Sequence, residues 1–196
     1  MNNVMSGYSV ISDIGNVLLK ILKENLCPDP IPNPETILLC SPFEEGDYFL
    51  SLHLYDIREN IYFKQVDLIN MDYEKKQYPP LSLTLYYLLS LKSFSDFRTK
   101  ASAEQKILGR VLQVLHDNQV LGVSTTSSTG RETNEPVRIE LNNLSFDRKL
   151  KFWAYSNTPN RLSLFFTASP VFIDSSKAKP SSSTVDRNFL FRKNSL

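Results

Sequence analysis

The chain has 196 residues, a length that suits one domain with an appendage or one slightly large domain. Its 22 basic side chains nearly balance its 21 acidic ones, and the net charge of +1 gives no long-range field toward nucleic acid or an acidic membrane. The first residues, MNNVMSGYSVISDIG, lack the features of a signal peptide, and no window has the roughly 18 apolar residues of a membrane span. Synthesis in the cytoplasm is therefore expected. With only two cysteines, Cys27 and Cys40, and two histidines, neither a disulfide nor a metal site is predicted.

Three segments have the apolar spacing of amphipathic helices, with hydrophobic residues three and four positions apart. The first covers residues 9–26 and ends before Pro28, because the residue ahead of a proline avoids helical backbone angles. The second covers residues 103–118, and a capping box of Ser102 and Gln105 is expected to start it. The third covers residues 145–156. The expected buried positions are Ile11, Ile14, Leu18, Ile21 and Leu22, then Ile107, Leu108, Val111, Leu112 and Leu115, then Leu150, Trp153 and Ala154.

Strand signals lie between and after these helices. The predicted strands cover residues 36–42, 47–60, 78–93, 137–143 and 160–174. The clearest signal is the alternation in residues 78–93, and it predicts that one wholly apolar face of this strand lies on the core. Pro170 indicates that the last strand lies at a sheet edge or bends there, because proline cannot donate a ladder hydrogen bond. Residues 61–77 are interpreted as a loop with one short strand.

The C-terminal end differs in character from the rest, so the chain divides into a domain of residues 1–174 and a linker with a C-terminal arm, residues 175–196. The linker is rich in Ser, Lys and Pro and cannot form a packed core. Apolar residues return in TVDRNFLFRK, residues 184–193. Two interpretations stay open for this arm: a disordered tail with chance aromatics, or a strand that adds to an exposed sheet edge of a partner. The residues expected to bind in the second case are Val185, Phe189, Leu190, Phe191 and Arg192.

Catalytic chemistry has little support in the sequence. His116 and Asp117 stand next to each other, but they fall in the last turn of a predicted helix, where a histidine is favoured by the helix dipole. A catalytic base also needs a nucleophile and an orienting group, and the chain has no G-x-S-x-G motif. His53 is expected on the less apolar face of a sheet. No glycine-rich phosphate loop is present, so no cofactor is predicted.

One polar cluster could serve an interface. Arg58, Glu59 and Asn60 follow one another at the end of the strand in residues 47–60. They are interpreted either as an intramolecular bridge or as a contact between subunits. Polar groups are common at strand ends, so their position alone does not separate the two interpretations.

Several segments, in this order, resemble a known family. They are the opening helix SVISDIGNVLLKIL, then LHLYDIREN (52–60), YPPLSLTLYYLLSL (78–91), EQKILGRVLQVLHDNQVL (104–121) and FWAYSNTPNRLSLFFTASPVFI (152–173). Together they look like the cap, or tail-terminator, family of phage-tail-like contractile injection systems. The resemblance covers roughly residues 6–174. No single motif decides it, whereas the order and spacing of the five segments are fairly specific.

The resemblance implies a structural protein and not an enzyme. Its implied fold is α/β, a mixed β-sheet with packed helices, and the arm would extend from it. Its implied partners are five further copies in a hexameric ring, the inner tube protein and the contractile sheath protein, with no nucleic acid and no small-molecule substrate. Such a ring terminates tube and sheath at the end distal to the baseplate, in a particle that can leave the cell. The alternative is a small adaptor that binds a partner through an edge strand and the C-terminal tail.

Overall fold

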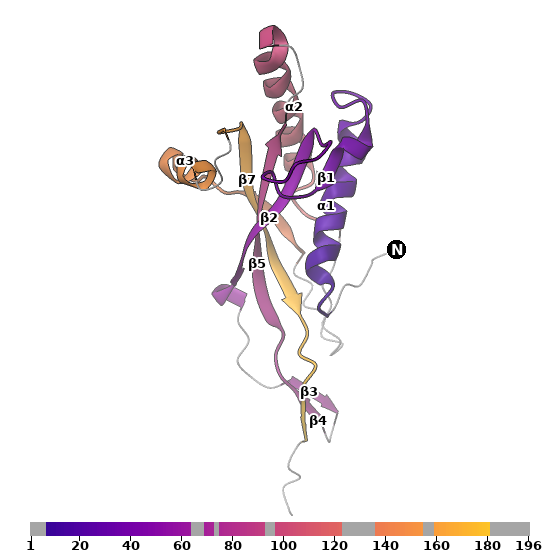
Figure 1. The fold of residues 1–196 in the computed structure, drawn as a ribbon. Helices are drawn as coiled ribbons and strands as arrows, with labels where there is room; N and C mark the ends of the chain where they lie inside the picture. The colour runs from indigo at the N-terminus through magenta and orange to yellow at the C-terminus, as the bar shows by residue number, and fades with distance from the viewer. Residues whose placement is uncertain are drawn as a thin grey trace, which may run out of the picture.

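The computed structural model describes residues 7–63, 69–72, 75–92, 97–122, 136–154 and 159–180. Within these ranges the chain forms two sheets and three α-helices (Figure 1). The helices are α1 (Val10–Leu26), α2 (Phe97–Asp117) and α3 (Phe146–Ala154). The larger sheet holds β1 (Ile37–Leu39), β2 (Leu50–Glu59), β5 (Leu81–Leu91), β6 (Arg138–Leu141) and β7 (Ser163–Ile173). The smaller sheet holds β3 (Ile69–Asp72), β4 (Lys75–Gln77) and β8 (Ala178–Pro180), and two 3-10 turns are η1 (Pro34–Thr36) and η2 (Ile61–Phe63).

The larger sheet is mixed, with the strand order β1-β2-β5-β7-β6. Strand β1 runs parallel to β2, and every other neighbouring pair in this sheet is antiparallel. The long strands β2, β5 and β7 form its centre, whereas the edge strands β1 and β6 are short. The expected fold class, a mixed sheet with packed helices, is therefore confirmed.

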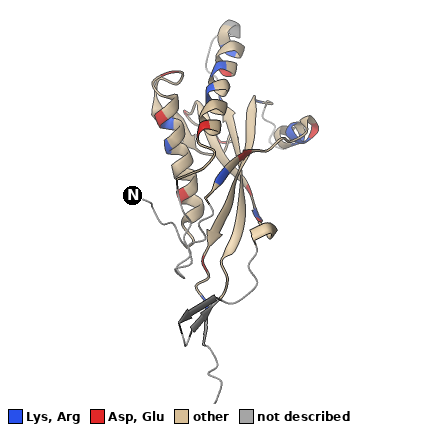
Figure 2. Cartoon of the chain, turned by 180° about the vertical axis from the view of Figure 1, so that it is seen from behind, with Lys and Arg blue, Asp and Glu red and all other residues tan. Residues whose placement is uncertain are grey.

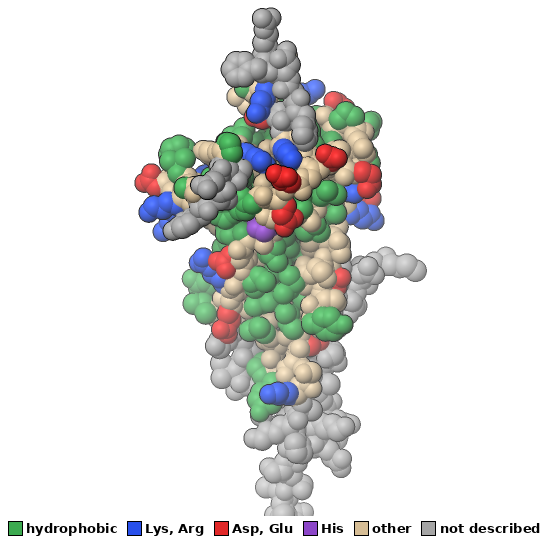
Figure 3. Space-filling model, in the orientation of Figure 1, with side chains coloured by type: hydrophobic (Ala, Val, Ile, Leu, Met, Phe, Trp, Pro, Cys, Tyr) green, Lys and Arg blue, Asp and Glu red, His purple; other side chains and the backbone are tan. Residues whose placement is uncertain are grey.

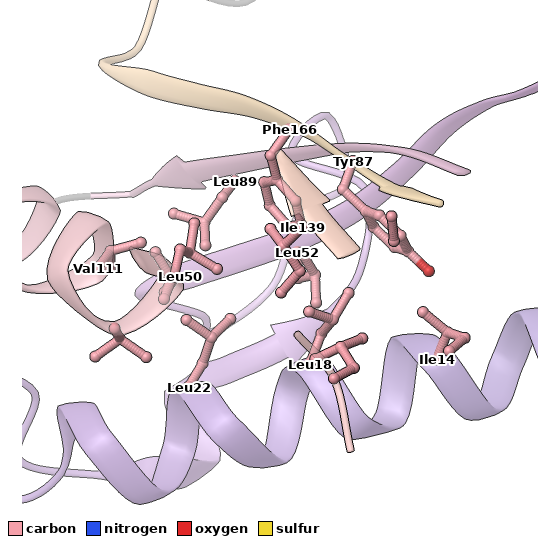
Figure 4. Packing of buried hydrophobic residues seen from close by; sticks show 14 of the residues in the cluster. Ile14, Leu18, Leu22, Leu50, Leu52, Tyr87, Leu89, Val111, Ile139 and Phe166 are labelled. Atoms are coloured by element: carbon pink, nitrogen blue, oxygen red, sulfur yellow. The ribbon is translucent and has the colours of Figure 1, made fainter. Parts of the chain in front are cut away.

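Helices α1 and α2 cover one side of this sheet, which we call the helix face. Side chains alternate between the two sides of a strand, and on β5 one row of the alternation supplies the residues of this face. That row is Leu83, Leu85, Tyr87, Leu89 and Leu91. Ile14, Leu18 and Leu22 of α1 pack toward it and are completely buried (Figure 4).

Helix α3 packs on the opposite side, which we call the aromatic face. Trp153 is 2% exposed and packs with Leu88 of β5 and Phe165 of β7. Tyr55 and Phe152 meet Phe165 edge to face, with ring centroids 5.6 Å apart in both pairs. Edge-to-face contact is a favoured geometry for aromatic pairs, so these contacts stabilise the position of α3 in addition to the burial of its apolar side chains.

The helices differ from expectation at three points. Helix α2 begins at Phe97, so the capping box at Ser102 is wrong: residues 97–102 contain no proline or glycine, and the helix continues through them. Leu112, expected in the core, is 37% exposed, while Val114 is buried. Leu150 is 39% exposed, and Ala154 is exposed as well. The spacing of apolar residues predicted each helix, but it did not predict which residues at the margins of the buried face are exposed.

The strands differ from expectation mainly in residues 61–77. For Pro170 the structure favours the second of the two alternatives: β7 lies between β5 and β6 and is not an edge strand, but its pairing with β5 shifts register between Ala168 and Val171. Pairing with β6 stops at Ser169, so within the described residues Pro170 has no β6 neighbour to which an N–H would be donated. Residues 61–77 contain two short strands, β3 and β4, where one was expected, and β8 lies inside the stretch interpreted as a linker.

Leu18→Ala should lower the free energy of unfolding by about 2–5 kcal/mol, because it removes a fully buried side chain from the helix face and leaves a cavity. Lys20→Ala, in the same helix but with an exposed side chain, should change it by less than about 0.5 kcal/mol. Urea unfolding followed by circular dichroism measures both. Equal effects of the two substitutions would contradict the packing described above.

Candidate interaction surfaces

His116 lies where the sequence placed it, in the last turn of α2. Its side chain is exposed, and its Nδ1 lies 2.9 Å from the Nε2 of Gln119. It lines a groove of about 430 Å³ between α2 and β6, together with the exposed Leu112 and Leu141. The contact with Gln119 joins His116 to the turn that ends the helix, which agrees with its interpretation as a helix-terminal residue.

His53 stands on the aromatic face, as expected, and is half-buried. Its ring meets Phe43 edge-on with the centroids 6.5 Å apart. Burial lowers the pKa of His53, and the carboxylate of Glu44 opposes this in part. The imidazole is therefore mainly neutral, and it packs against Phe43 as another aromatic ring would.

The two cysteines are unpaired and half-buried. Burial raises the pKa of Cys27 and of Cys40, which keeps both groups as thiols at neutral pH. Neither therefore has the low pKa of a reactive cysteine.

Arg58, Glu59 and Asn60 do not form one cluster. The Nε of Arg58 lies 2.7 Å from the carboxylate of Asp56, and the guanidinium lies over the ring of Tyr86, 4.9 Å from its centroid. Glu59 is exposed. Arg58 and Glu59 are thus the two members of the predicted set that a partner could reach.

Asn60 points into the molecule and is only 9% exposed. Its Nδ2 donates to the Oγ of Ser169 at 2.8 Å and to the Oγ1 of Thr84 at 3.3 Å, and its Oδ1 accepts from the N–H of Tyr62 at 3.1 Å. This side chain therefore joins β7, β5 and η2, and the bonds explain why a buried amide is tolerated here.

A second groove, which the sequence did not indicate, lies between the first turns of α1 and the edge of the sheet. It has a volume of about 440 Å³, and Ile11, Gly15, Leu39, Leu54 and Tyr87 form most of its wall. We call it the α1 groove. Most of its lining is apolar, which distinguishes it from the groove of Glu44, Glu45, Asp47, Lys92 and Arg161 on another part of the surface.

Large apolar side chains are exposed where the sheet approaches the small one. They include Ile57 (43%), Ile61 (69%), Tyr62 (90%), Tyr78 (45%) and Leu81 (45%). The pairing of Glu59 with Leu83 places η2 and the start of β5 at the same end of the sheet. Charged residues are frequent on the helices (Figure 2), and hydrophobic side chains form a column along the middle of the view in Figure 3.

The predicted binding residues of the arm, Val185 to Arg192, lie outside the described residues. In the described part, no three or more His, Cys, Asp or Glu side chains are grouped so that they could hold a metal ion. No helix in those ranges is long and apolar enough to span a membrane.

Taken together, the described residues form an α/β module whose sheet is covered on both faces, with short edge strands, a groove of mixed lining beside β6 and a largely apolar groove beside β1. The chain belongs to the Pvc16 N-terminal domain family, whose model matches residues 14–187. A comparison with curated proteins found no match.

Two solved structures share the fold. One is the sheath/tube terminator of PVC, an extracellular contractile injection system, in its extended state, with a TM-score of 0.63 and 16% identity over 98% of this chain and 66% of that one. The other is the tube-terminating cap of the anti-feeding prophage, with a TM-score of 0.60 and 17% identity over 93% of this chain and 61% of that one. The chain thus spans less than two thirds of the length of either solved protein. The fold expected from the family resemblance is confirmed.

The half-buried His53 should make stability depend on pH. Its pKa is lowered in the folded state, so as the pH falls below about 6.5 the unfolded chain takes up a proton that the folded chain does not. The free energy of unfolding should therefore decrease from pH 7.5 to 5.5, as measured by urea unfolding. His53→Phe should make this decrease smaller, and His116→Gln, at an exposed position, should leave it unchanged. The reverse pattern would contradict the assignment.

Proposed function

We propose that this chain is a terminator subunit of a contractile injection system, which closes the inner tube and the contractile sheath at the end distal to the baseplate. The observation that carries the proposal is the family match over residues 14–187, and the two solved proteins of the same fold are a sheath/tube terminator and a tube-terminating cap. On this proposal the protein has a structural and not an enzymatic role, and the particle acts outside the cell that makes it.

The surface supports a role in assembly. The exposed apolar residues at the small-sheet end and the mainly apolar α1 groove are features of protein–protein contacts, and the net charge of +1 leaves little repulsion between copies. We propose that six copies form a ring on the last layer of the tube and sheath. In this ring Arg58 and Glu59 contact a neighbour, and Asn60 supports them from inside through its bonds to β5 and β7.

We further propose that the arm, residues 184–193, is a binding strand. Its apolar residues Val185, Phe189, Leu190 and Phe191 would enter pockets of a partner, and Arg192 would meet an acidic group there. Several arms on one ring act together, so weak single contacts add up to a firm cap through their high effective concentration.

Particles from a strain that lacks this protein should have tubes and sheaths of uncontrolled length, or no stable sheath, in electron micrographs. The reason is that nothing would then stop polymerisation or hold the sheath to the tube. Particles from the same strain that expresses the intact chain are the control. Uniform particles of normal length in the deletion strain would contradict the proposal and favour a small adaptor that binds elsewhere.

Removal of residues 181–196, which keeps β8, should leave the far-UV circular dichroism spectrum and the thermal midpoint nearly unchanged, because the described core lies before residue 181. The truncated chain should fail to restore particle length in the deletion strain. A truncated chain that restores normal length would show that the arm is not a binding element.

A further inference from the structure

The α1 groove contains a buried hydroxyl that has no partner among the described residues. Tyr87 is 1% exposed, and no hydrogen bond reaches its Oη in that part of the chain. Its ring is stacked on Phe166, which fixes it, and the hydroxyl points toward α1 (Figure 4). Burial raises the pKa of Tyr87, so the group keeps its proton and stays a donor. Buried polar groups are nearly always hydrogen-bonded, and this one therefore marks a place where an acceptor is missing.

Gly15 of α1 lies beside this hydroxyl. A Cβ atom at this position would lie 3.7 Å from the Oη of Tyr87 and 3.4 Å from both Cδ atoms of Leu39, which are ordinary contact distances. The rest of the lining is mainly apolar, with Ser9, Ser12 and Asn16 on the α1 side. The groove thus offers apolar walls and, at Tyr87, a buried donor without an acceptor, which suits an apolar side chain next to a backbone carbonyl.

The sheet edge beside the groove is open. Strand β1 pairs with Leu50–Leu52 only. The last hydrogen bond beside this pairing is donated by the N–H of Cys40 to the carbonyl of Leu52. From Leu54 to Glu59, β2 has no neighbouring strand on that side within the described residues. The N–H of Ile57 is bonded to the carboxylate of Asp56 at 2.9 Å, which blunts the edge of a single copy.

We propose that the C-terminal arm of one copy, residues 184–193, adds to β2 of a second copy in line with β1, and inserts an apolar side chain into the α1 groove beside Tyr87. This inference rests on the proposed function, in which the arm is a binding strand, and it names the partner and the site. An added strand would supply a backbone carbonyl as acceptor for Tyr87 and an apolar side chain to fill the groove, because an extended segment presents carbonyls and side chains in alternation.

The direction and length of the chain favour a second copy as the acceptor. Strand β7 runs toward the small sheet, and β8 continues in that direction, away from the helices (Figure 1). From Pro180, an extended chain reaches residue 193 over about 45 Å, enough to cross to a neighbouring subunit. An arm that returned to its own β2 would have to reverse directly after β8.

Charge favours the same pairing. The arm carries Arg187, Arg192 and Lys193 against the single acid Asp186. The acceptor side carries Asp56, Arg58 and Glu59 on β2, and because Arg58 is paired with Asp56 its net charge is −1. Because donor and acceptor lie on different parts of one molecule, the contact is head-to-tail, and such contacts form a ring where the rotation from one copy to the next closes.

Photocrosslinking of the full chain tests this inference. Phe189 is replaced by p-benzoylphenylalanine, and equal amounts of this chain and of an isotope-labelled normal chain are assembled and irradiated. The expected product is a covalent dimer whose crosslinked peptide from the other isotope contains residues 8–16, 39 or 54. Crosslinks within one chain, to the tube or sheath protein, to the N-terminal six residues, or to no site at all would each overturn the inference.

Two substitutions at leucines of similar exposure sharpen the result. Leu39→Glu places a charge in the mouth of the α1 groove and should lower the dimer yield at least tenfold, whereas Leu150→Glu, on α3 and outside both grooves, should leave it unchanged. Circular dichroism checks that both variants fold. Equal losses in the two variants, or no loss in Leu39→Glu, would contradict the site.

Tyr87→Phe separates binding from folding. It removes the unpartnered hydroxyl, so the thermal midpoint of the unassembled chain should stay the same or rise, while the crosslinked dimer should decrease several-fold. An unchanged dimer yield would overturn the role of the hydroxyl. Crosslinks to the sheath together with defective particle ends in the deletion strain would reject this inference and leave the terminator function intact.

Discussion

Strand β5 is buried from both sides, and the rest of the structure depends on how its two rows of side chains are covered. One row, which includes Leu85, Tyr87 and Leu89, packs under α1 and α2, and the other row brings Leu88 under α3. A strand of this kind requires long partners on both edges, which β2 and β7 provide. The helices then have little freedom of position, because each must cover one particular row.

Covering the two faces leaves the edges of the sheet as the places where a second molecule can add. Strands β1 and β6 are short, and each is flanked by a groove, mainly apolar beside β1 and of mixed lining beside β6. Edge strands in monomeric proteins are usually blunted, as Asp56 does here for Ile57, whereas an assembly subunit keeps part of an edge accessible. The packing that covers both faces of the sheet thus leaves its edges as the surfaces for contact with other subunits.

Much of the fold could be predicted from the sequence because the alternation in residues 78–93 and the apolar spacing in residues 9–26 depend on local periodicity alone. The start of α2 was missed because a local capping signal at Ser102 does not stop a helix that has no breaker before it. Pro170 predicted an edge position or a bend, and the sequence could not choose between them because strand order is a long-range property: the proline lies beyond the end of β6, where the pairing of β7 with β5 is irregular.

Less of the candidate site than of the fold could be predicted from the sequence. Arg58, Glu59 and Asn60 are adjacent in the chain, but Asn60 lies beyond the end of β2 and is fixed inside by groups far away in sequence, Thr84 and Ser169. The α1 groove depends on Gly15, Leu39, Leu54 and Tyr87, which no motif connects. A glycine within an amphipathic helix was its one visible signal in the sequence.

The proposed terminator role depends on this body and its arm closing a growing cylinder. Cryo-electron microscopy of the baseplate-distal end of purified particles tests that idea most directly. The account predicts a closed ring of this chain seated on the last layer of both tube and sheath, with density from each copy reaching β2 of the next. A distal end that carries the last tube and sheath layers without this chain, or with single unconnected copies of it, would contradict the account.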